Sequence, residues 1–589
     1  MNKTKAVKLL QTKKDLWIPL LGFLILCLIK ALIVLPMADG PVSFGDELGY
    51  RNYSFQWFHY GTQQGSPHYP MVYPIAMMAS FLMKDWYMAM KVLNIFYSSL
   101  TIVFLYMIAR LYLDEKKSAL FMIVGATIPF QFTFPAMVLS ENVFFPLLLL
   151  VIYITLYPFK QKRGYDEVGF AKVQGSWFMT DILLGFCICA LCLTRFIAIV
   201  TVPVFALVWF MKMWDQKVRF RYILLRGILI VITIVVCYLP WYLIWCDRFP
   251  FKEIIGFGIT SKTNPEQLTM KRLILSAAFY VAYYILLASP MILWLVYSLI
   301  SVEFKKLCGA YNRLWIMVYG IMGAFFVAVT RHSWRASYNY PTYYRIMGRY
   351  LIIFPILFIL LALVTREKWI EHHKEKTILG AVIAAMISGI SFGAVVFSYL
   401  LDIKGTFYPL SDKFLSWKGA VDGYKMGVIG TKWLVGIGIA MLVLWLVDFV
   451  SIKNLQKYGV VMIGCMLVLL QLWGMKDYYA YIYEVRASRA FASIREMNEI
   501  FMDTEVLQTE LVYDLSQKVD KSWENKYLKF FGNNENLTIV ALDEVSADVY
   551  YVVCDASTIG KYDGHIIEEV GRFIRLDNEN IILKVNGAN

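Results

Sequence analysis

Residues 17–37 read "WIPLLGFLILCLIKALIVLPM". A helix needs roughly 20 predominantly apolar residues to cross the hydrocarbon core of a bilayer, and this run meets that length. It is too long for the apolar core of a cleavable signal peptide, and no small-residue cleavage site follows it. The run therefore predicts a retained first transmembrane helix in an integral membrane protein.

The composition of the whole chain supports this class. Hydrophobic residues make up 59% of the 589 residues and charged residues 17%, whereas an ordinary soluble domain has about half and about a quarter. The net charge of +14 is explained by basic residues that collect in cytoplasmic loops. No basic block interleaved with aromatic residues indicates a nucleic-acid surface. Most of the cysteines lie in apolar runs, which favours packing over metal or redox chemistry.

Apolar runs of spanning length recur along the chain. The hydropathy procedure predicts about thirteen transmembrane helices. They lie near residues 17–37, 88–110, 118–138, 142–158, 179–194, 196–213, 227–245, 274–300, 314–330, 350–365, 377–400, 432–450 and 458–474. The predicted fold is therefore an all-α polytopic membrane protein.

Basic residues predict the orientation. The segment before the first span is rich in lysine, and cytoplasmic loops collect Lys and Arg, so we expect the N-terminus in the cytoplasm. Short basic segments recur in alternate loops, at residues 114–117, 160–164, 215–221, 303–306 and 366–376. An odd number of spans then places the C-terminus outside the cytoplasm. The short loops favour a bacterial cell membrane as the location.

The last part of the chain differs in composition. From about residue 476 it turns polar, and residues 486–503 have the apolar spacing of a helix. Short runs with strand character follow at residues 510–515, 537–542, 549–554, 572–576 and 581–585. We therefore predict a transmembrane domain over residues 1–475, with a long first outside loop at 38–87, and a small extracytoplasmic α/β domain over 476–589.

An acidic pair stands where the chain leaves the first span. Residues 43–53 read "SFGDELGYRNY", with Asp46 and Glu47 adjacent and Tyr50 among the aromatic neighbours. Such carboxylates are often simply solvated in a loop, but ionisable residues near membrane depth are candidates for function. In a helix, neighbouring side chains lie about 100° apart around the axis. Only one of the pair can then face a cavity, and we expect Asp46 to react and Glu47 to support it.

Two single charges interrupt the apolar runs further along. Glu141, in "VLSENVFFP", is preceded by Ser140, which could cap a helix whose dipole favours the carboxylate. Arg195, in "LCLTRFIAIVTVP", stands alone between two apolar runs. An arginine at that depth needs an anionic partner. Glu141 or Asp46 would provide one, and a phosphate, which suits guanidinium geometry, would provide another.

Arginines and aromatic residues gather in two further segments. Residues 331–355 carry Arg331, Arg335, Arg345 and Arg349 among tyrosines, although outside loops are usually poor in arginine. This predicts an anion site, with lipid headgroup anchoring as the alternative for at least two of them. Residues 65–78, "GSPHYPMVYPIAMM", include His68 and Tyr69 and lead into an apolar stretch too short to span. It could form a re-entrant or interfacial helix.

The sequence lacks several catalytic motifs. There is no phosphate-binding G-x-x-x-x-G-K-[ST] loop and no H-E-x-x-H zinc motif. We therefore predict no metal site and no cofactor, with a divalent cation left open.

In this order, the motifs resemble the GT-C superfamily of membrane glycosyltransferases. The similarity is to the branch that uses lipid carriers, which includes protein O-mannosyltransferases and bacterial aminoarabinose transferases. The motifs are "GDELGY", "PHYPMVYP", "VLSENVFFP", "LTRF", "LPWYL" and "GRYLIIFP". The resemblance covers about the first 370 residues well. It implies a sugar donor carried on a polyprenyl or dolichyl phosphate, and inverting transfer to an acceptor outside the cytoplasm.

The resemblance also implies roles for single residues. Asp46 would be the general base, and Arg195 stands where aminoarabinose transferases have a lysine that faces the lipid phosphate. Arg349 matches a basic position before the tenth span. One departure concerns Tyr69, preceded by His68, at a place where aminoarabinose transferases have a phosphate-binding lysine. Phosphate binding is thereby left to the arginines, and the identity of the sugar is left open.

Two other functions compete with glycosyl transfer. A secondary transporter or flippase would use the intramembrane charges along a path, but transporters usually show internal repeats, and none is evident. A polymerase or ligase acting on lipid-linked polysaccharide would share the arginines without needing the early acidic pair. For a glycosyltransferase, the acceptor could be a lipid, a cell-wall polymer or a protein.

Overall fold

The structure is a computed structural model of the chain. It describes most of residues 14–403 and 491–587. The exceptions are 38–39, 42–43, 129, 159–169, 172, 174, 257–267, 289–290, 303–305, 337–347, 372–375, 503–508, 576–577 and, apart from 525, 528 and 531, residues 517–536. Between 404 and 490 it describes only isolated positions. The chain divides into two compact units, one of Met1–Leu35 and Tyr53–Tyr478, the other of Pro36–Asn52 and Tyr479–Asn589.

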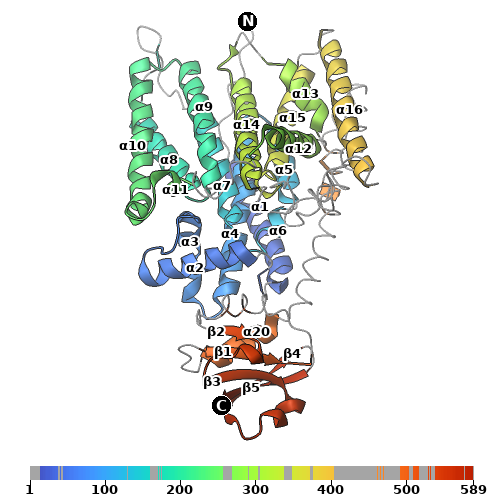
Figure 1. Ribbon diagram of the computed structural model, residues 1–589. Coiled ribbons are helices and arrows are strands. Elements are labelled where there is room, and N and C mark those ends of the chain that lie inside the picture. Colours follow the sequence, from blue (N-terminus) through green and yellow to red (C-terminus); the bar gives the residue numbers. More distant parts are fainter. Residues whose placement is uncertain are drawn as a thin grey trace. The chain divides into compact units, whose positions relative to one another are not determined.

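The first unit is helical (Figure 1). Its helices before residue 195 are α1 (Lys14–Val34), α3 (Val72–Met77), η2 (Met78–Leu82), α4 (Trp86–Ala109), α5 (Glu115–Ala126), α6 (Phe130–Thr133), α7 (Glu141–Leu156) and α8 (Gly175–Cys192). Those after it are η3 (Phe196–Thr201), α9 (Val202–Asp215), α10 (Phe220–Trp245), α11 (Phe251–Ile254), α12 (Met270–Ala288), α13 (Ile292–Ile300), α14 (Ala310–Ala336), η8 (Gly348–Tyr350), α15 (Phe354–Glu371) and α16 (Lys376–Ile403).

Seven helices in the described part of the chain are long and apolar enough to cross a membrane. They are Leu16–Val34, Trp86–Ala109, Gly175–Cys192, Phe196–Asp215, Phe220–Trp245, Met270–Ala288 and Ala310–Arg335. The protein is thus a mostly helical polytopic membrane protein, as predicted. The predicted runs near 432–450 and 458–474 lie almost entirely outside the described residues, so the total of about thirteen spans stays a prediction.

Two predicted spans are broken by prolines. The run at 118–138 is not one helix, because α5 ends at Ala126 and α6 at Thr133. Pro129 and Pro135 stand in this stretch, and proline removes a backbone donor and clashes with the preceding turn. The run at 274–300 likewise divides into α12 and α13, with Pro290 between them in the sequence.

The helices pack where one face is buried and expose apolar side chains elsewhere. α4 packs against α1, α5 and α7, and α8 packs against α10. Gly185 on α8 allows that last approach, because a Cβ there would lie 2.8 Å from the carbonyl oxygen of Ile230. The opposite face of α10 exposes Val231, Val235 and Leu239, as expected of a helix that faces lipid.

The second unit contains a five-stranded mixed sheet in the order β2-β1-β3-β5-β4. The strands are β1 (Thr509–Asp514), β2 (Leu537–Val540), β3 (Val549–Asp555), β4 (Ile566–Arg575) and β5 (Asn578–Asn586), and the helix α20 spans Phe491–Met502. β1 is parallel to β2 and β3, while β5 is antiparallel to β3 and β4. Each strand predicted from the sequence coincides with an observed one.

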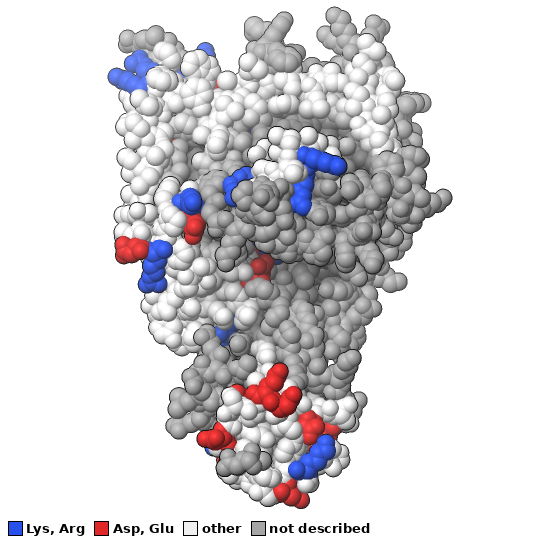
Figure 2. Space-filling model, viewed as in Figure 1, with Lys and Arg blue, Asp and Glu red and all other residues white. Residues whose placement is uncertain are grey.

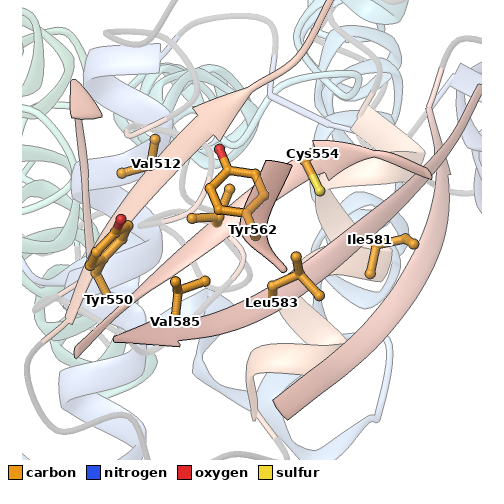
Figure 3. Close-up of a cluster of buried hydrophobic side chains, with 8 residues drawn as sticks. Val512, Tyr550, Cys554, Tyr562, Ile581, Leu583 and Val585 are labelled. Atoms are coloured by element: carbon orange, nitrogen blue, oxygen red, sulfur yellow. The ribbon is translucent and has the colours of Figure 1, made fainter. Parts of the chain in front are cut away.

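Alternation along the strands gives the sheet two covered faces. Tyr550, Val552 and Cys554 point to one face, where they pack with Leu583 and Val585 in a buried cluster (Figure 3). Tyr551 points to the other face and meets Phe501 of α20, with ring centroids 5.4 Å apart. Most of the exposed charged side chains described in this unit are acidic, and acidic residues gather on it in the face drawn in Figure 2.

Candidate functional site

Glu141 is the first residue of α7, and it is almost completely buried, with 2% of its surface exposed. The helix dipole favours a carboxylate in this first turn. The expected cap by Ser140 is not formed: its side chain makes no capping hydrogen bond, and its Oγ instead accepts one from Nη1 of Arg195 at 3.3 Å. Ser140 and Glu141 therefore both face the arginine.

Arg195 lies in extended backbone between α8 and η3, and its side chain is buried. Its Nη1 forms an ion pair with Oε1 of Glu141. Its Cζ also lies 4.4 Å from the ring centroid of Tyr350, in cation–π geometry. The sequence left open whether Arg195 pairs with Glu141, and the structure shows that it does.

Arg349 approaches the same carboxylate from η8. Its Nε lies 3.2 Å from Oε1 of Glu141, and its Cζ lies 5.7 Å from the ring centroid of Tyr350. We call Ser140, Glu141, Arg195, Arg349 and Tyr350 the Glu141 cluster. Within the described part of the chain, no hydrogen bond reaches Oε2 of Glu141.

A second buried ion pair, between Arg226 and Asp181, offers a comparison. Arg226 Nη2 donates to Oδ1 of Asp181 at 2.9 Å, its Nε contacts Oδ2, and Trp209 Nε1 also donates to Oδ1 at 3.3 Å. Both carboxylate oxygens of Asp181 are thus satisfied. The Glu141 cluster differs because two guanidinium groups approach one carboxylate oxygen, while no hydrogen bond from the described residues reaches the other.

Asp46 and Glu47 lie in the first turn of α2 (Phe44–Tyr60), so the acidic pair is helical. Glu47 is fully buried, Tyr50 is buried, and Asp46 is partly exposed. The two carboxylates therefore have different surroundings, as their separation around the helix axis requires. They belong to the second compact unit, and the Glu141 cluster belongs to the first.

His68 and Tyr69 lie in the turn before α3. Gln63 Nε2 donates to the carbonyl oxygen of Tyr69 at 2.9 Å, and the Tyr69 ring lies 5.6 Å from that of Tyr53. His68 is exposed. The expected short apolar helix is present as α3 and η2. The backbone N–H of Val72 bonds to the carbonyl oxygen of Leu193 at 3.0 Å, which ties this segment to the stretch that carries Arg195.

The other predicted arginines are placed differently. Arg331 and Arg335 do not lie in a loop, because α14 continues to Ala336, and Arg331 is exposed on that helix. α14 can continue past the predicted end of the span near residue 330, because the residues that follow are tolerated in a helix and the first proline is Pro341. Arg345 lies outside the described residues. Among the described members of this group, Arg349 is the one that lies beside Glu141.

Sequence reasoning passed over buried lysines inside predicted spans. Lys30 of α1 is fully buried, and its Nζ donates to Ser98 Oγ and Gln131 Oε1, both at 2.8 Å. Lys91 of α4 is also fully buried. A charged residue inside an apolar span is a signal for function, and it was available in both cases. Tyr350 belongs to the "GRYLIIFP" motif, but the sequence indicated no separate role for it.

The described residues contain no group of three or more His, Cys, Asp or Glu side chains placed to hold a metal ion. The guanidinium donors of Arg195 and Arg349 are of the type that binds an anion, because they bind phosphate in a planar fork. The described residues thus form a polytopic membrane protein in which two arginines meet a buried glutamate beside an interrupted helix.

No protein-family model matches the chain, and no curated protein matches it in sequence. Solved structures do match over nearly its full length. One is ArnT from Cupriavidus metallidurans bound to undecaprenyl phosphate, with 12% identity, a TM-score of 0.47, and coverage of 97% of this chain and 98% of that chain. Another is the archaeal oligosaccharyltransferase AglB from Archaeoglobus fulgidus, in complex with an inhibitory peptide and a dolichol-phosphate. It has 9% identity, a TM-score of 0.37, and coverage of 93% and 70%.

Proposed function

We propose that this chain is an integral membrane glycosyltransferase of the GT-C type. It transfers a sugar from a polyprenyl-phosphate donor to an acceptor outside the cytoplasm, with inversion at the anomeric carbon. The observation that carries the proposal is the convergence of Arg195 and Arg349 on the buried Glu141. The order of the sequence motifs supports the same function.

The two arginines of the cluster suit a monophosphate donor. A phosphodiester that links a lipid to one sugar carries a single negative charge, and guanidinium groups donate to its oxygens in a planar fork. Arginine holds such a group through parallel hydrogen bonds. In a buried site these bonds are stronger than in water. Arg331 and Arg345 remain predicted phosphate ligands, and Glu141, His68, Tyr69 and Tyr50 remain predicted cavity residues.

The reaction needs a base and a stabilised leaving group. The acceptor hydroxyl oxygen attacks the anomeric carbon while the Asp46 carboxylate takes its proton, with Glu47 in support. The bond between that carbon and the phosphate oxygen breaks, and the lipid phosphate leaves with the bonding electrons. Arg195 and Arg349 stabilise the charge that develops on the phosphate. No second carboxylic acid is needed, in contrast to glycoside hydrolysis.

The topology proposed for this function follows the sequence. About thirteen spans place the N-terminus in the cytoplasm and the domain at 476–589 outside it. The flipped lipid donor would then present its phosphate at the outer membrane edge, the side on which α2 begins. The cell membrane is the proposed location, and lipids, cell-wall polymers and proteins are the proposed acceptor classes.

The test is transfer from a panel of radiolabelled polyprenyl-phosphate sugars by purified full-length protein, with membrane extract as the source of acceptor. We expect one donor to be consumed by the wild type. We expect Asp46→Asn to bind that donor but not to transfer the sugar, and Asp563→Asn, which changes an exposed carboxylate of the second unit, to be fully active. Full activity of Asp46→Asn would place the base elsewhere. If the wild type consumes no donor, a transporter becomes the better hypothesis.

A further inference from the structure

The segment that joins α6 to α7 is irregular and completely buried. Residues 134–140 are not helical, and each of them is buried. In a membrane protein, non-helical backbone must find its hydrogen-bond partners inside the protein or in a water-filled cavity. Because the segment is packed inside the protein, its carbonyl groups need hydrogen-bond donors from the protein itself. These donors identify what holds the segment in place.

Three side chains hold the carbonyl groups of this segment. Lys91 Nζ donates to the carbonyl oxygen of Ala136 at 2.6 Å, and Asn94 Nδ2 donates to that of Met137 at 3.0 Å. Asn142, one residue after Glu141, donates to the carbonyl oxygens of Phe134 and Leu139, both at 3.0 Å. The segment is therefore fastened from α4 on one side and from α7 on the other.

Lys91 and Asn94 are three residues apart on α4, so they share one face of the helix. Both are fully buried. Asn94 uses its second polar atom as well, because its Oδ1 accepts a hydrogen bond from Tyr73 of α3 at 2.9 Å. Lys91 also lies over the ring of Tyr87, with 4.2 Å between Nζ and the centroid. The α4 face thus connects α3 with the irregular segment.

Lys91 is a fully buried ionisable residue inside a helix of spanning length. A charge at membrane depth costs several kcal/mol unless it is compensated, and such residues are by default functional candidates. The segment that Lys91 and Asn94 hold ends at Ser140 and Glu141. A shift of this segment would move the carboxylate that sets the positions of both arginines.

We propose that Lys91 and Asn94 are positioning residues for the Glu141 cluster. They fix the irregular segment, and thereby Glu141, at the place where Arg195 and Arg349 converge. Neither residue is part of the phosphate site or of the proton transfer proposed above. This inference rests on the proposed function where it is tested by glycosyl transfer. The test by thermal stability does not depend on that function.

The variant that tests this is Lys91→Met, which removes the donor and keeps a flexible side chain of similar length. A misplacement of about 1 Å in a catalytic group costs up to about 100-fold in rate. We expect kcat per folded molecule to fall between 10- and 100-fold, with KM changed less than kcat. Lys91→Arg, which keeps the charge and the donor, restores most of the rate. If Lys91→Met does not fold, Asn94→Ala, which removes the hydrogen bond to the carbonyl oxygen of Met137, takes its place in the same assay.

Lys212 provides a matched control. It is likewise a fully buried lysine, and its Nζ donates to the carbonyl oxygen of Ile154 at 3.1 Å, near the other end of α7. Lys212→Met therefore removes the same kind of bond away from the cluster. We expect it to lower stability and to leave kcat per folded molecule unchanged. An equal loss of kcat in the two lysine variants would overturn the proposal.

A double-mutant cycle with Glu141→Gln tests whether Lys91 acts through Glu141. If Lys91 acts through Glu141, then Lys91→Met lowers kcat further by less than about 3-fold in this background, because effects of coupled residues do not add. A full additional loss would show that Lys91 acts independently, and the proposal would be wrong.

The same double-mutant cycle can be measured by thermal unfolding. If no donor is consumed by the wild type, the proposed function fails, and the melting temperatures of Lys91→Met, Glu141→Gln and the double variant decide the inference alone. We expect the double variant to lose clearly less stability than the sum of the single losses. Strict additivity would mean that the two residues are uncoupled.

Discussion

Arg349 Nε lies 3.2 Å from Oε1 of Glu141, the same oxygen with which Arg195 is paired. One carboxylate oxygen thus organises two guanidinium groups from separate parts of the chain, and Tyr350 lies against both. Under the proposed function, the two guanidinium groups are already oriented before the phosphate binds, which lowers the cost of reorganisation during the reaction.

Replacing Glu141 tests how far the carboxylate stabilises the cluster. We expect Glu141→Gln to lower the free energy of unfolding by about 3 kcal/mol, because breaking a buried pair leaves positive charge uncompensated. Undecaprenyl phosphate should then stabilise the variant more than the wild type, since the lipid phosphate takes over the missing negative charge. Thermal unfolding of the purified protein with and without the lipid measures both effects. An unchanged melting temperature would contradict this account, and Glu569→Gln, on the exposed surface of the sheet unit, serves as control.

Replacing the arginines tests anion binding directly. We expect Arg195→Ala and Arg349→Ala each to weaken binding of undecaprenyl phosphate at least about 10-fold, the equivalent of one charge-assisted hydrogen bond. Arg195→Lys should restore binding only in part, because lysine lacks the planar fork. Binding is measured by titration of the purified protein, and Arg572→Ala, an exposed arginine of the sheet unit, should bind as the wild type does. Equal affinity in all variants would exclude the cluster as the phosphate site.

Glu510 makes the stability of the sheet unit depend on pH. Hydrogen bonds from the Ser546 hydroxyl group and from the backbone N–H groups of Ser546 and Ala547 hold the pKa of Glu510 below its ordinary value. A lowered pKa in the folded state stabilises the protein above the ordinary pKa, and this contribution is lost as the pH falls through the folded-state value. The site is close to solvent, so we expect an effect below about 1 kcal/mol.

The measurement for Glu510 is thermal unfolding between pH 7 and pH 3. Glu510→Gln and Ser546→Ala should lose stability at pH 7 and approach the wild type as the pH falls. Glu496→Gln, an exposed carboxylate of α20, should follow the wild type throughout. A constant difference between Glu510→Gln and the wild type at every pH would contradict the account.

The thiol of Cys554 should react slowly with maleimide. Burial in the cluster on β3 raises its pKa to about 11, so roughly one molecule in a thousand is a thiolate at pH 8. Because the thiolate is the reactive form, maleimide should label Cys246, which is partly exposed, well before Cys554. Unfolding in denaturant should remove the difference. Rapid labelling of Cys554 in the folded protein, read by mass spectrometry of peptides, would contradict this burial.

Gly185 should tolerate no side chain. A Cβ there would lie 2.8 Å from the carbonyl oxygen of Ile230 and 2.8 Å from Cβ of Thr233. Overpacking of this kind costs about 1–3 kcal/mol, so Gly185→Ala should lower the melting temperature. Gly389→Ala is the matched control, since a Cβ at that helical position meets nothing within 4 Å. Equal melting temperatures for the two variants would show that α8 and α10 can separate at no cost.

Local patterns in the sequence determined much of this protein. Apolar runs predicted the membrane helices, and short runs with strand character predicted the strands of the sheet unit. The acidic pair was placed in a long outside loop, with a helix considered as one case, and the structure places it in α2. These features depend on residues that are neighbours in the chain, so periodicity and composition are sufficient to find them. The breaks at 118–138 and 274–300 were missed although the prolines stood in the sequence, because average hydropathy does not register a missing backbone donor.

Only the tertiary structure decided which charges meet. Glu141, Arg195 and Arg349 are far apart in the chain, and the sequence offered Glu141, Asp46 or a phosphate as partners for Arg195. The fold brings Arg195 and Arg349 to Glu141, and Arg331 lies on the surface of α14. The same fold gives Lys91 its partner in Ala136. Such contacts depend on how helices are arranged in space, and that arrangement follows from the burial of all their faces together rather than from any one segment.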